Sequence, residues 1–229
     1  MNTTHGLSVG MLLFPNLTQL DLTGPYEIFA RMPNTKITLL GETMAPVRSD
    51  RGLSLLPQQT FDEAGQFDLI MVPGGPGVTP LMEHEPTLGF LRAQAAGARY
   101  TTSVCTGALL LGAAGLLRGY RATTHWMSLD LLPLFGAEPC EARYVVDRDR
   151  ITGGGVTAGV DFALAVAAEL YGRDVAQRIQ LMVEYDPAPP FAGGTPATAR
   201  PELLAQVIEQ ARPLQEQRRE IAQRVASRL

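Results

Sequence analysis

The chain of 229 residues has no excess of basic side chains. It contains 19 lysines and arginines against 23 aspartates and glutamates, a formal net charge of −4 at pH 7. Proteins bind nucleic-acid backbones by neutralising phosphates with basic residues, so this balance argues against a nucleic-acid partner. The remaining composition, 45% apolar and 18% charged residues, is that of an ordinary globular protein.

The sequence also lacks a long apolar run. Residues 104–117 form the longest apolar stretch, which falls short of the roughly 20 residues that a membrane-spanning helix needs and is typical of a buried helix. No basic segment followed by a hydrophobic one precedes residue 7 in the manner of a secretory leader. We therefore expect no membrane span and a cytoplasmic location.

Cysteine is scarce, because Cys105 and Cys140 are the only two. They allow at most one disulfide, and in a reducing compartment both are expected to be free thiols. Cys140 lies in a turn-like segment with no histidine or second cysteine nearby in sequence. The sequence therefore predicts neither a metal site nor a redox pair around it.

Short strand-like runs alternate with helical stretches, which predicts an α/β fold with a mostly parallel sheet and helices on both faces. The predicted strands cover residues 8–14, 36–40, 67–72, 100–104 and 122–125. Two hairpins are expected, at residues 44–57 and at residues 144–152 with Arg148 and Asp149 at the tip. The predicted helices cover residues 86–97, 106–117, 126–135 and 174–184, with two more starting near Thr23, just ahead of Pro25, and near Thr157.

The C-terminal part of the chain differs in composition from the rest. Residues 186–201 contain five prolines and two glycines, which predicts a linker or a long surface loop. Residues 201–229 predict a charged amphipathic helix, broken once at Pro213, whose arginines and glutamates form a solvated face. We expect an α/β domain over residues 1–190, followed by a linker and helical extension over residues 191–229.

The junction between a predicted strand and a predicted helix carries the most informative motif. Residues 103–107 read SVCTG, with a small residue two positions before Cys105 and a glycine two positions after it. This pattern has the form of the Gly-x-Ser-x-Gly turn, in which small residues allow a bend that lifts a nucleophile off a sheet. The amides of the following helix, that of Thr106 above all, predict a lowered thiol pKa and stabilisation of negative charge. A buried structural cysteine is the alternative.

Two further motifs are expected at the same edge of the sheet. Asp21 follows the first strand, and Gly74 and Gly75 end the strand at residues 67–72. The carboxyl ends of parallel strands lie together, so these residues should approach Cys105. The glycine amides are candidates for oxyanion or substrate binding, with a tight turn as the alternative. Asp21 is a candidate acid or base, with helix capping as a compatible alternative.

Three histidines are available as proton carriers. His5 lies in an N-terminal segment that is expected to fray, and His84 lies in a polar loop. His125 ends a predicted strand and is the histidine expected to reach the site, with a partly buried, backbone-bonded histidine as the alternative. The neighbouring Trp126 and Met127 are expected in the core.

Several segments together resemble the ThiJ/PfpI superfamily of glutamine-amidotransferase-like proteins. They are LDLTGP at residues 20–25, VPGG at 72–75, SVCTG at 103–107, ATTHW at 122–126 and TGGG at 152–155. Within that superfamily the chain is most similar to the isocyanide-hydrating members, including YDPAPPF at residues 185–191. It departs from the peptidase-like members, which place a histidine where this chain has Thr106.

The resemblance implies a flavodoxin-like fold and a cofactor-free hydration of isocyanides to N-substituted formamides. Cys105 would be the nucleophile that forms a thioimidate, and Asp21 would be the general acid and base. Thr106 would orient the water or the intermediate. The amides of Gly74 and Gly75 would bind or polarise the substrate, an isocyanide.

The resemblance leaves other functions open. Glyoxalase or deglycase members also use a reactive cysteine on this turn, and redox sensing at Cys105 is a further alternative. Transcription regulators carry the same fold as a ligand-sensing domain, but the residues after 201 are too few and too weakly basic for a helix-turn-helix. Superfamily members commonly form dimers, so a homodimer with the C-terminal helix in its interface is expected. His125 is expected to support the site from behind the reacting groups.

Overall fold

The structure, a computed structural model, describes residues 6–229 and centres on a seven-stranded sheet. The strand order is β10-β11-β7-β6-β1-β2-β5, and all neighbouring pairs are parallel except β10 with β11. The strands are β1 Leu7–Leu12, β2 Thr35–Gly41, β5 Gln59–Thr60, β6 Leu69–Val72, β7 Tyr100–Val104, β10 Tyr144–Asp147 and β11 Arg150–Gly153. This topology confirms the predicted mostly parallel sheet and its C-terminal hairpin.

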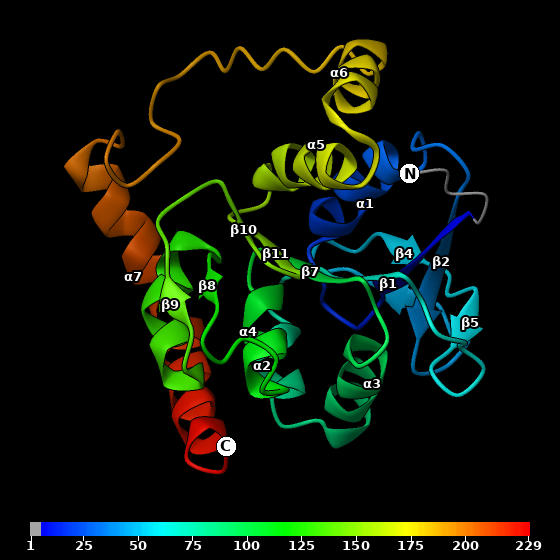
Figure 1. Ribbon diagram of the computed structural model, residues 1–229. Helices are drawn as coiled ribbons and strands as arrows, with labels where there is room; N and C mark the ends of the chain where they lie inside the picture. Colours follow the sequence, from blue (N-terminus) through cyan, green and yellow to red (C-terminus); the bar gives the residue numbers. More distant parts are fainter. Residues whose placement is uncertain (1–5) are drawn as a thin grey trace.

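Helices cover both faces of the sheet, as predicted (Figure 1). One face carries α1 Gln19–Phe29 and α5 Ala158–Tyr171, with α6 Arg173–Met182 packed on α5. The other face carries α2 Val78–Leu81, α3 Glu85–Ala95 and α4 Gly107–Ala113, flanked by the 3₁₀ helix η1 Trp126–Phe135 and by α7 Pro201–Ala226. Because both faces are covered, the central strands are buried on both sides.

Two helices have different bounds from those predicted. Helix α1 begins at Gln19, and Pro25 lies inside it rather than near its start. A Cβ at Gly159 of α5 would lie 3.2 Å from the Pro25 ring, so the proline is accommodated where the two helices approach closely. Helix α4 ends at Ala113, short of the predicted residue 117, because Gly115 adopts a φ of +78° that terminates helices.

The segment around His125 also differs from prediction. The strand predicted over residues 122–125 is reduced to β8 Arg121–Ala122, which pairs with β9 Glu138–Pro139 outside the main sheet. Residues 126–135 are helical as predicted, but in the 3₁₀ form. Trp126 is exposed and Met127 half-buried, so their predicted place in the core is wrong. They lie at the side of the domain that faces α7 rather than the sheet.

The first predicted hairpin is confirmed, with β3 Val47–Arg48 paired to β4 Ser54–Leu55. The sequence did not predict β5, β9 or α2. These elements have only two to four residues. Runs this short contain too few positions to show a period of two or of 3.6 residues.

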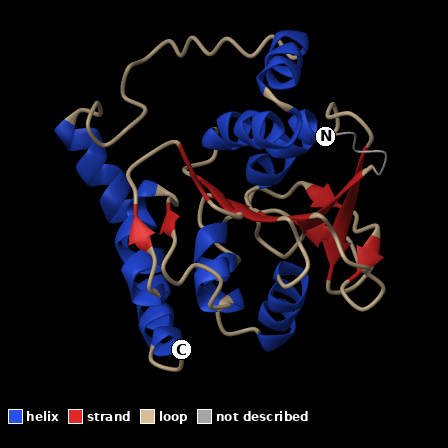
Figure 2. Ribbon diagram, viewed as in Figure 1, coloured by secondary structure: helices blue, strands red, loops and turns tan. Residues whose placement is uncertain are grey.

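Residues 183–200 form a long loop that leaves the body between α6 and α7 (Figure 2). Helix α7 then continues through Pro213, so the predicted break there is wrong. It packs on η1, α2 and α4 and buries Ile221, Ala222 and Val225, all of which follow the proline. The boundary at residue 190 stays a prediction. Within residues 6–229 no helix has both the length and the apolarity needed to cross a membrane.

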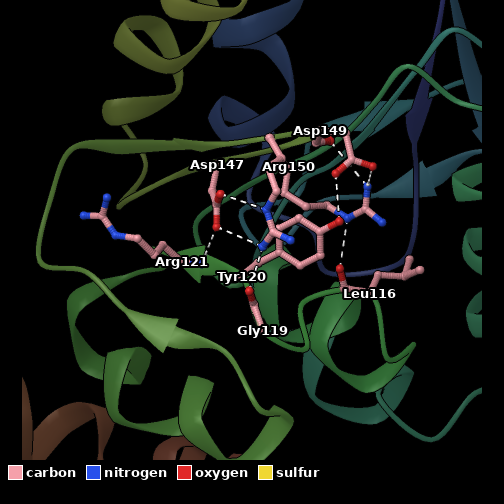
Figure 3. A network of polar contacts seen from close by, with 8 residues as sticks. Leu116, Gly119, Tyr120, Arg121, Asp147, Asp149 and Arg150 are labelled. Atoms are coloured by element: carbon pink, nitrogen blue, oxygen red, sulfur yellow. Dashed lines mark hydrogen bonds and ion pairs between the residues drawn. The ribbon is translucent and has the colours of Figure 1, made fainter.

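A polar network holds the tip of the β10–β11 hairpin (Figure 3). This tip lies where β7 begins, whereas Cys105 follows the end of β7. The Arg148 guanidinium lies 3.7 Å from the centroid of the Tyr120 ring, and the Tyr120 hydroxyl donates to Asp149 Oδ1 at 2.8 Å. Arg150 Nε donates to the carbonyl oxygen of Leu116 at 2.9 Å. These contacts join the hairpin to the segment after α4, away from the edge where Cys105 lies.

Candidate active site

Cys105 occupies a sharp bend between β7 and α4. Its φ is +56°, in the left-handed region that non-glycine residues rarely adopt. Its amide donates to the carbonyl oxygens of Gly153 and Gly154, at 3.0 and 2.9 Å, and its own carbonyl accepts from Thr124 Oγ1 at 2.7 Å. The sharp turn predicted from the motif is confirmed, and these bonds hold its strained backbone in place.

Glycines allow the ends of β6 and β7 to approach each other closely. A Cβ at Gly74 would lie 2.8 Å from the Cβ of Cys105 and 2.8 Å from Oδ2 of Asp21. A Cβ at Gly107 would lie 2.2 Å from the carbonyl oxygen of Val72. No side chain fits at either position, so the glycines of both motifs bring Asp21 and Cys105 together.

Asp21 lies in the first turn of α1 and is completely buried. Its Oδ2 atom accepts the amide of Gly74 at 3.0 Å, and its carboxyl lies beside Cys105, because both residues border the same position on Gly74. Among residues 6–229 its Oδ1 atom has no hydrogen-bond partner. The N-cap residue of α1 is Thr18 and no side chain caps this helix, so Asp21 faces the site instead of capping.

The surroundings of Asp21 hold its pKa near neutrality. Burial raises the pKa of Asp21 to about 7, against the hydrogen bonds from Cys105 and Gly74, which lower it. The negative charge of Asp50, in the loop between β3 and β4, adds to the rise in pKa. A carboxyl with such a pKa can both accept and donate a proton at neutral pH.

The Cys105 thiol is also harder to ionise than a free cysteine. Burial, followed by the charge of Asp21, raises the pKa of Cys105 well above its usual value. The amide of Thr106 and the charge of Arg218 lower this pKa, but by less. The predicted lowering by the helix N-terminus is therefore wrong in its net sign, because desolvation outweighs the amide of Thr106. Cys105 rests as a thiol with an acceptor, Asp21, beside it.

The amides of the two candidate glycines are bonded to side chains of the site. Gly74 donates to Asp21, as described above, and Gly75 donates to Thr106 Oγ1 at 3.0 Å. The Thr106 hydroxyl in turn donates to the carbonyl oxygen of Gly75 at 3.3 Å. In this structure the two glycines hold Asp21 and Thr106 in position, and the amide of Thr106 acts to lower the pKa of Cys105.

His125 matches the alternative of a partly buried, backbone-bonded histidine. Its Nδ1 atom accepts the amide of Met127 at 3.3 Å and so caps η1. Burial lowers the pKa of His125, and the charge of Arg218 lowers it further, which favours the neutral ring. His84 begins α3 and its ring bonds within that helix, while His5 lies outside the described residues.

Sequence reasoning missed Arg218, which the structure brings to the site from α7. It is buried, although the arginines of this helix were expected to be solvated. Its position relative to Ile221, Ala222 and Val225, at intervals of three, four and seven residues, places it on the buried face of the helix. That spacing is the signal from which its burial could have been predicted.

Other parts of the described chain offer no metal site. Among residues 6–229, no cluster of three or more histidine, cysteine, aspartate or glutamate side chains could hold a metal ion.

A groove of about 640 Å³ lies between the long loop and the first turns of α7. Its apolar lining includes Trp126, Phe191, Leu203, Leu204 and Val207.

With the turn and the buried carboxyl in place, comparison with known proteins identifies the family. The profile of the DJ-1/PfpI family matches residues 7–169, so the chain belongs to this family, and the predicted ThiJ/PfpI resemblance is confirmed. An isonitrile hydratase from Pseudomonas putida is 53% identical over 97% of this chain and 98% of its own. A ThiJ/PfpI family protein from Pseudomonas syringae, of known crystal structure, is 42% identical with a TM-score of 0.92, covering 95% of this chain and 90% of its own.

A regulator also shares the fold. The HTH-type transcriptional regulator GbdR from Pseudomonas aeruginosa is 32% identical over 78% of this chain, but the match covers only 51% of the regulator. The similarity therefore concerns about half of that protein. The isonitrile hydratase, by contrast, matches along almost its whole length.

Proposed function

We propose that the protein hydrates isocyanides to N-substituted formamides, with Cys105 as the nucleophile. The observation that carries this proposal is the buried pair of Cys105 and Asp21, which lie side by side against Gly74 at the strained turn. The high identity to an isonitrile hydratase over nearly both full lengths supports the choice of substrate class. A small molecule also suits a thiol that is only 5% exposed.

The first half of the reaction adds the thiol to the isocyanide carbon. This carbon carries no leaving group, so a nucleophile and a proton must both be supplied. The thiol proton of Cys105 passes to ionised Asp21, and the sulfur forms a bond to the terminal carbon. Asp21 then gives the proton to the same carbon, which yields the thioimidate R–N=CH–S–Cys105. The pKa of about 7 suits Asp21 to both transfers.

The second half adds water and releases the product. Asp21 takes a proton from the attacking water as the oxygen bonds to the thioimidate carbon, and Asp21 then gives this proton to the nitrogen. The tetrahedral adduct then expels the sulfur as the carbonyl forms, and the hydroxyl proton returns to Cys105 through Asp21. One isocyanide and one water give one formamide, with no cofactor needed.

Thr106 and the glycines support these steps. The amide of Thr106 faces the sulfur and stabilises its negative charge whenever the thiolate forms or leaves. Thr106 also orients the water or the intermediate at the helix N-terminus. Gly74 and Gly75 act through the side chains that their amides hold, Asp21 and Thr106. His125 is a supporting residue, because no step requires a further proton carrier.

Formamide production from an aryl isocyanide tests this function. We expect turnover by the wild-type chain, and a loss of at least about a thousandfold in Cys105→Ser. Cys140→Ser is the matched control and keeps wild-type turnover, because this thiol lies outside the site. Turnover retained in Cys105→Ser would refute the proposal. Turnover of methylglyoxal without turnover of isocyanide would select the glyoxalase or deglycase function instead.

We also propose that the protein is located in the cytoplasm, where both free thiols stay reduced.

We further propose that two copies of the chain pair through α7. Leu203, Val207 and Ile208 are exposed on the first half of α7, and Trp126 is exposed beside them. Apolar side chains gathered in one region of a surface commonly mark a protein–protein contact. A second copy of this chain is the occupant that the family resemblance favours.

A further inference from the structure

Arg218 differs from four other arginines on α7 and just beyond its C-terminal end. The others are exposed and pair with carboxylates: Arg212 with Glu209, Arg219 with Asp130, and both Arg224 and Arg228 with Glu83. Arg218 is only 3% exposed, and among residues 6–229 no carboxylate lies within ion-pair distance of it. It is therefore a buried cation without an acidic partner.

The hydrogen bonds of Arg218 fix its position but leave its charge uncompensated. Nε donates to Thr79 Oγ1 of α2 and Nη1 donates to Ser128 Oγ of η1, both at 3.2 Å. When the side-chain oxygen and nitrogen of Gln215 are exchanged, which satisfies the hydrogen bonds around this amide, its oxygen also accepts from Arg218 Nη1 at 3.1 Å. All three acceptors are neutral. Burying a cation in this way is costly unless a negative charge forms nearby.

The packing of α7 brings Arg218 toward Cys105. Helix α7 packs on α4, which begins two residues after Cys105, and on α2, which holds Thr79 and also packs on α4. The charge of Arg218 lowers the pKa of Cys105, and the charge of Cys105 raises the pKa of Arg218, which burial lowers. The other ionisable groups nearby are Asp21 of α1, which faces Cys105, and His125 of η1, whose pKa Arg218 lowers. Asp50 acts on Asp21 from the loop between β3 and β4.

We propose that Arg218 is a positioning residue of the site, whose buried guanidinium provides the positive charge that stabilises the Cys105 thiolate after Asp21 has taken its proton. The role deepens the proposed function and rests on it, because it matters to catalysis only if Cys105 is the nucleophile. With the proton on Asp21, the three groups together carry no net charge. Helix α7 therefore completes the active site from the far end of the chain.

The pH dependence of Cys105 alkylation tests this role without using an isocyanide. The full chain carrying Cys140→Ser, which leaves one thiol, is treated with iodoacetamide across a pH series, and adducts are counted by intact mass. Arg218→Met removes the charge and keeps an apolar stem, Arg218→Lys keeps a charge, and Arg219→Met is the matched control on the adjacent exposed arginine.

We expect Arg218→Met to shift the alkylation midpoint upward by about one pH unit, so that alkylation near pH 8 slows on the order of tenfold. Arg218→Lys recovers most of this loss, and Arg219→Met follows the parent profile. An unchanged midpoint in Arg218→Met would overturn the proposal. If this variant does not fold by circular dichroism, Arg218→Gln, which keeps a hydrogen-bond donor without the charge, is compared with Arg218→Lys under the same criterion.

Turnover of an aryl isocyanide by the same variants separates the two proposals. If Arg218 acts as inferred, kcat falls with the alkylation rate in Arg218→Met and recovers in Arg218→Lys. Wild-type chain that makes no formamide, while the alkylation midpoint still depends on Arg218, would contradict only the proposed function. Normal turnover by Arg218→Met with an unchanged midpoint would contradict only the role of Arg218.

Discussion

At the scale of single residues, the site places two acids where neither ionises easily. Asp21 is held near neutrality and Cys105 rests as a thiol, so a proton can move between them with little change in energy. The amide of Thr106 at the helix N-terminus lowers the pKa of Cys105, but burial raises this pKa by more. Here the thiol depends on a neighbouring base for its activation.

The pH dependence of turnover follows from this pair. Asp21 must be ionised to accept the thiol proton, so kcat/KM is expected to fall about tenfold per pH unit below an apparent pKa near 7. Asp50→Asn removes a charge that raises the pKa of Asp21 and is expected to move this acid limb to lower pH. A pH-rate profile measures both effects. A profile that stays flat from about pH 8 down to about pH 5 would exclude Asp21 as the base.

The same burial makes Asp21 costly for the fold. Its pKa is about 7 in the folded chain against 3.8 for an aspartate side chain in water, so the folded state binds the proton more tightly. The loss in the free energy of unfolding caused by ionising Asp21 is absent below about pH 4, grows as the pH rises and reaches its full size above about pH 7. We expect Asp21→Asn to raise the free energy of unfolding by roughly 2 kcal/mol at about pH 8, with the gain vanishing near pH 4. Urea unfolding at both pH values checks this, and a loss of stability at pH 8 would contradict it.

Local patterns predicted part of the site. Cys105 could be placed because a five-residue motif determines its turn, and Asp21 because it follows a buried strand in a parallel sheet. The net pKa of Cys105 could not be predicted, because it depends on burial in the assembled fold. Arg218 was missed because its distance to Cys105 is set by the packing of α7, which lies more than a hundred residues further along the chain.

At the scale of elements, the approach of α4 to the end of β6 decides whether the site can form. Gly107 is the first residue of α4 and packs against the carbonyl oxygen of Val72, which leaves no room for a side chain. The longer helices α3 and α5 could be predicted, α5 from the apolar face that its residues form. The two-residue strands and the 3₁₀ form of η1 could not, because tertiary contacts rather than local pattern select them.

A glycine substitution tests this close contact. Gly107→Ala adds a Cβ that would lie 2.2 Å from the carbonyl oxygen of Val72. We expect this substitution to destabilise the fold by about 3 kcal/mol or more. Gly65→Ala is the control, because a Cβ there meets no atom within 4 Å and the backbone has no positive φ. It should change the free energy of unfolding by less than about 0.5 kcal/mol. If urea unfolding gave the same change in the free energy of unfolding for both substitutions, the close contact between β6 and α4 would not be needed for stability.

At the scale of the whole molecule, distant parts of the chain converge at one edge of the sheet. The turns after β6 and β7, the first turn of α1, and α7 each contribute a group to the site. The first half of α7 and the long loop before it extend beyond this core (Figure 1). Several of their apolar side chains are exposed, among them Phe191, Leu203 and Val207. One half of the helix thus packs against the core near the active site, and the other half carries the surface on which we propose that a second copy packs.

The proposed dimer is tested on that exposed half. Val207→Asp introduces a charge into the apolar groove, and we expect it to convert a dimer to a monomer in size-exclusion chromatography with light scattering. Glu202→Gln, at the start of the same helix, is the control and should leave the assembly unchanged. A wild-type chain that is monomeric at micromolar concentration would contradict the proposed pairing.

The central claim is that Cys105 bonds covalently to the isocyanide carbon during turnover. Acid quenching during turnover of an aryl isocyanide, followed by intact mass measurement and peptide mapping, tests it most directly. We predict a mass gain equal to one isocyanide, located on Cys105, that persists longer in Asp21→Ala because water is no longer activated. Formamide production with no adduct on Cys105 in either chain, or with the adduct only on Cys140, would contradict the account.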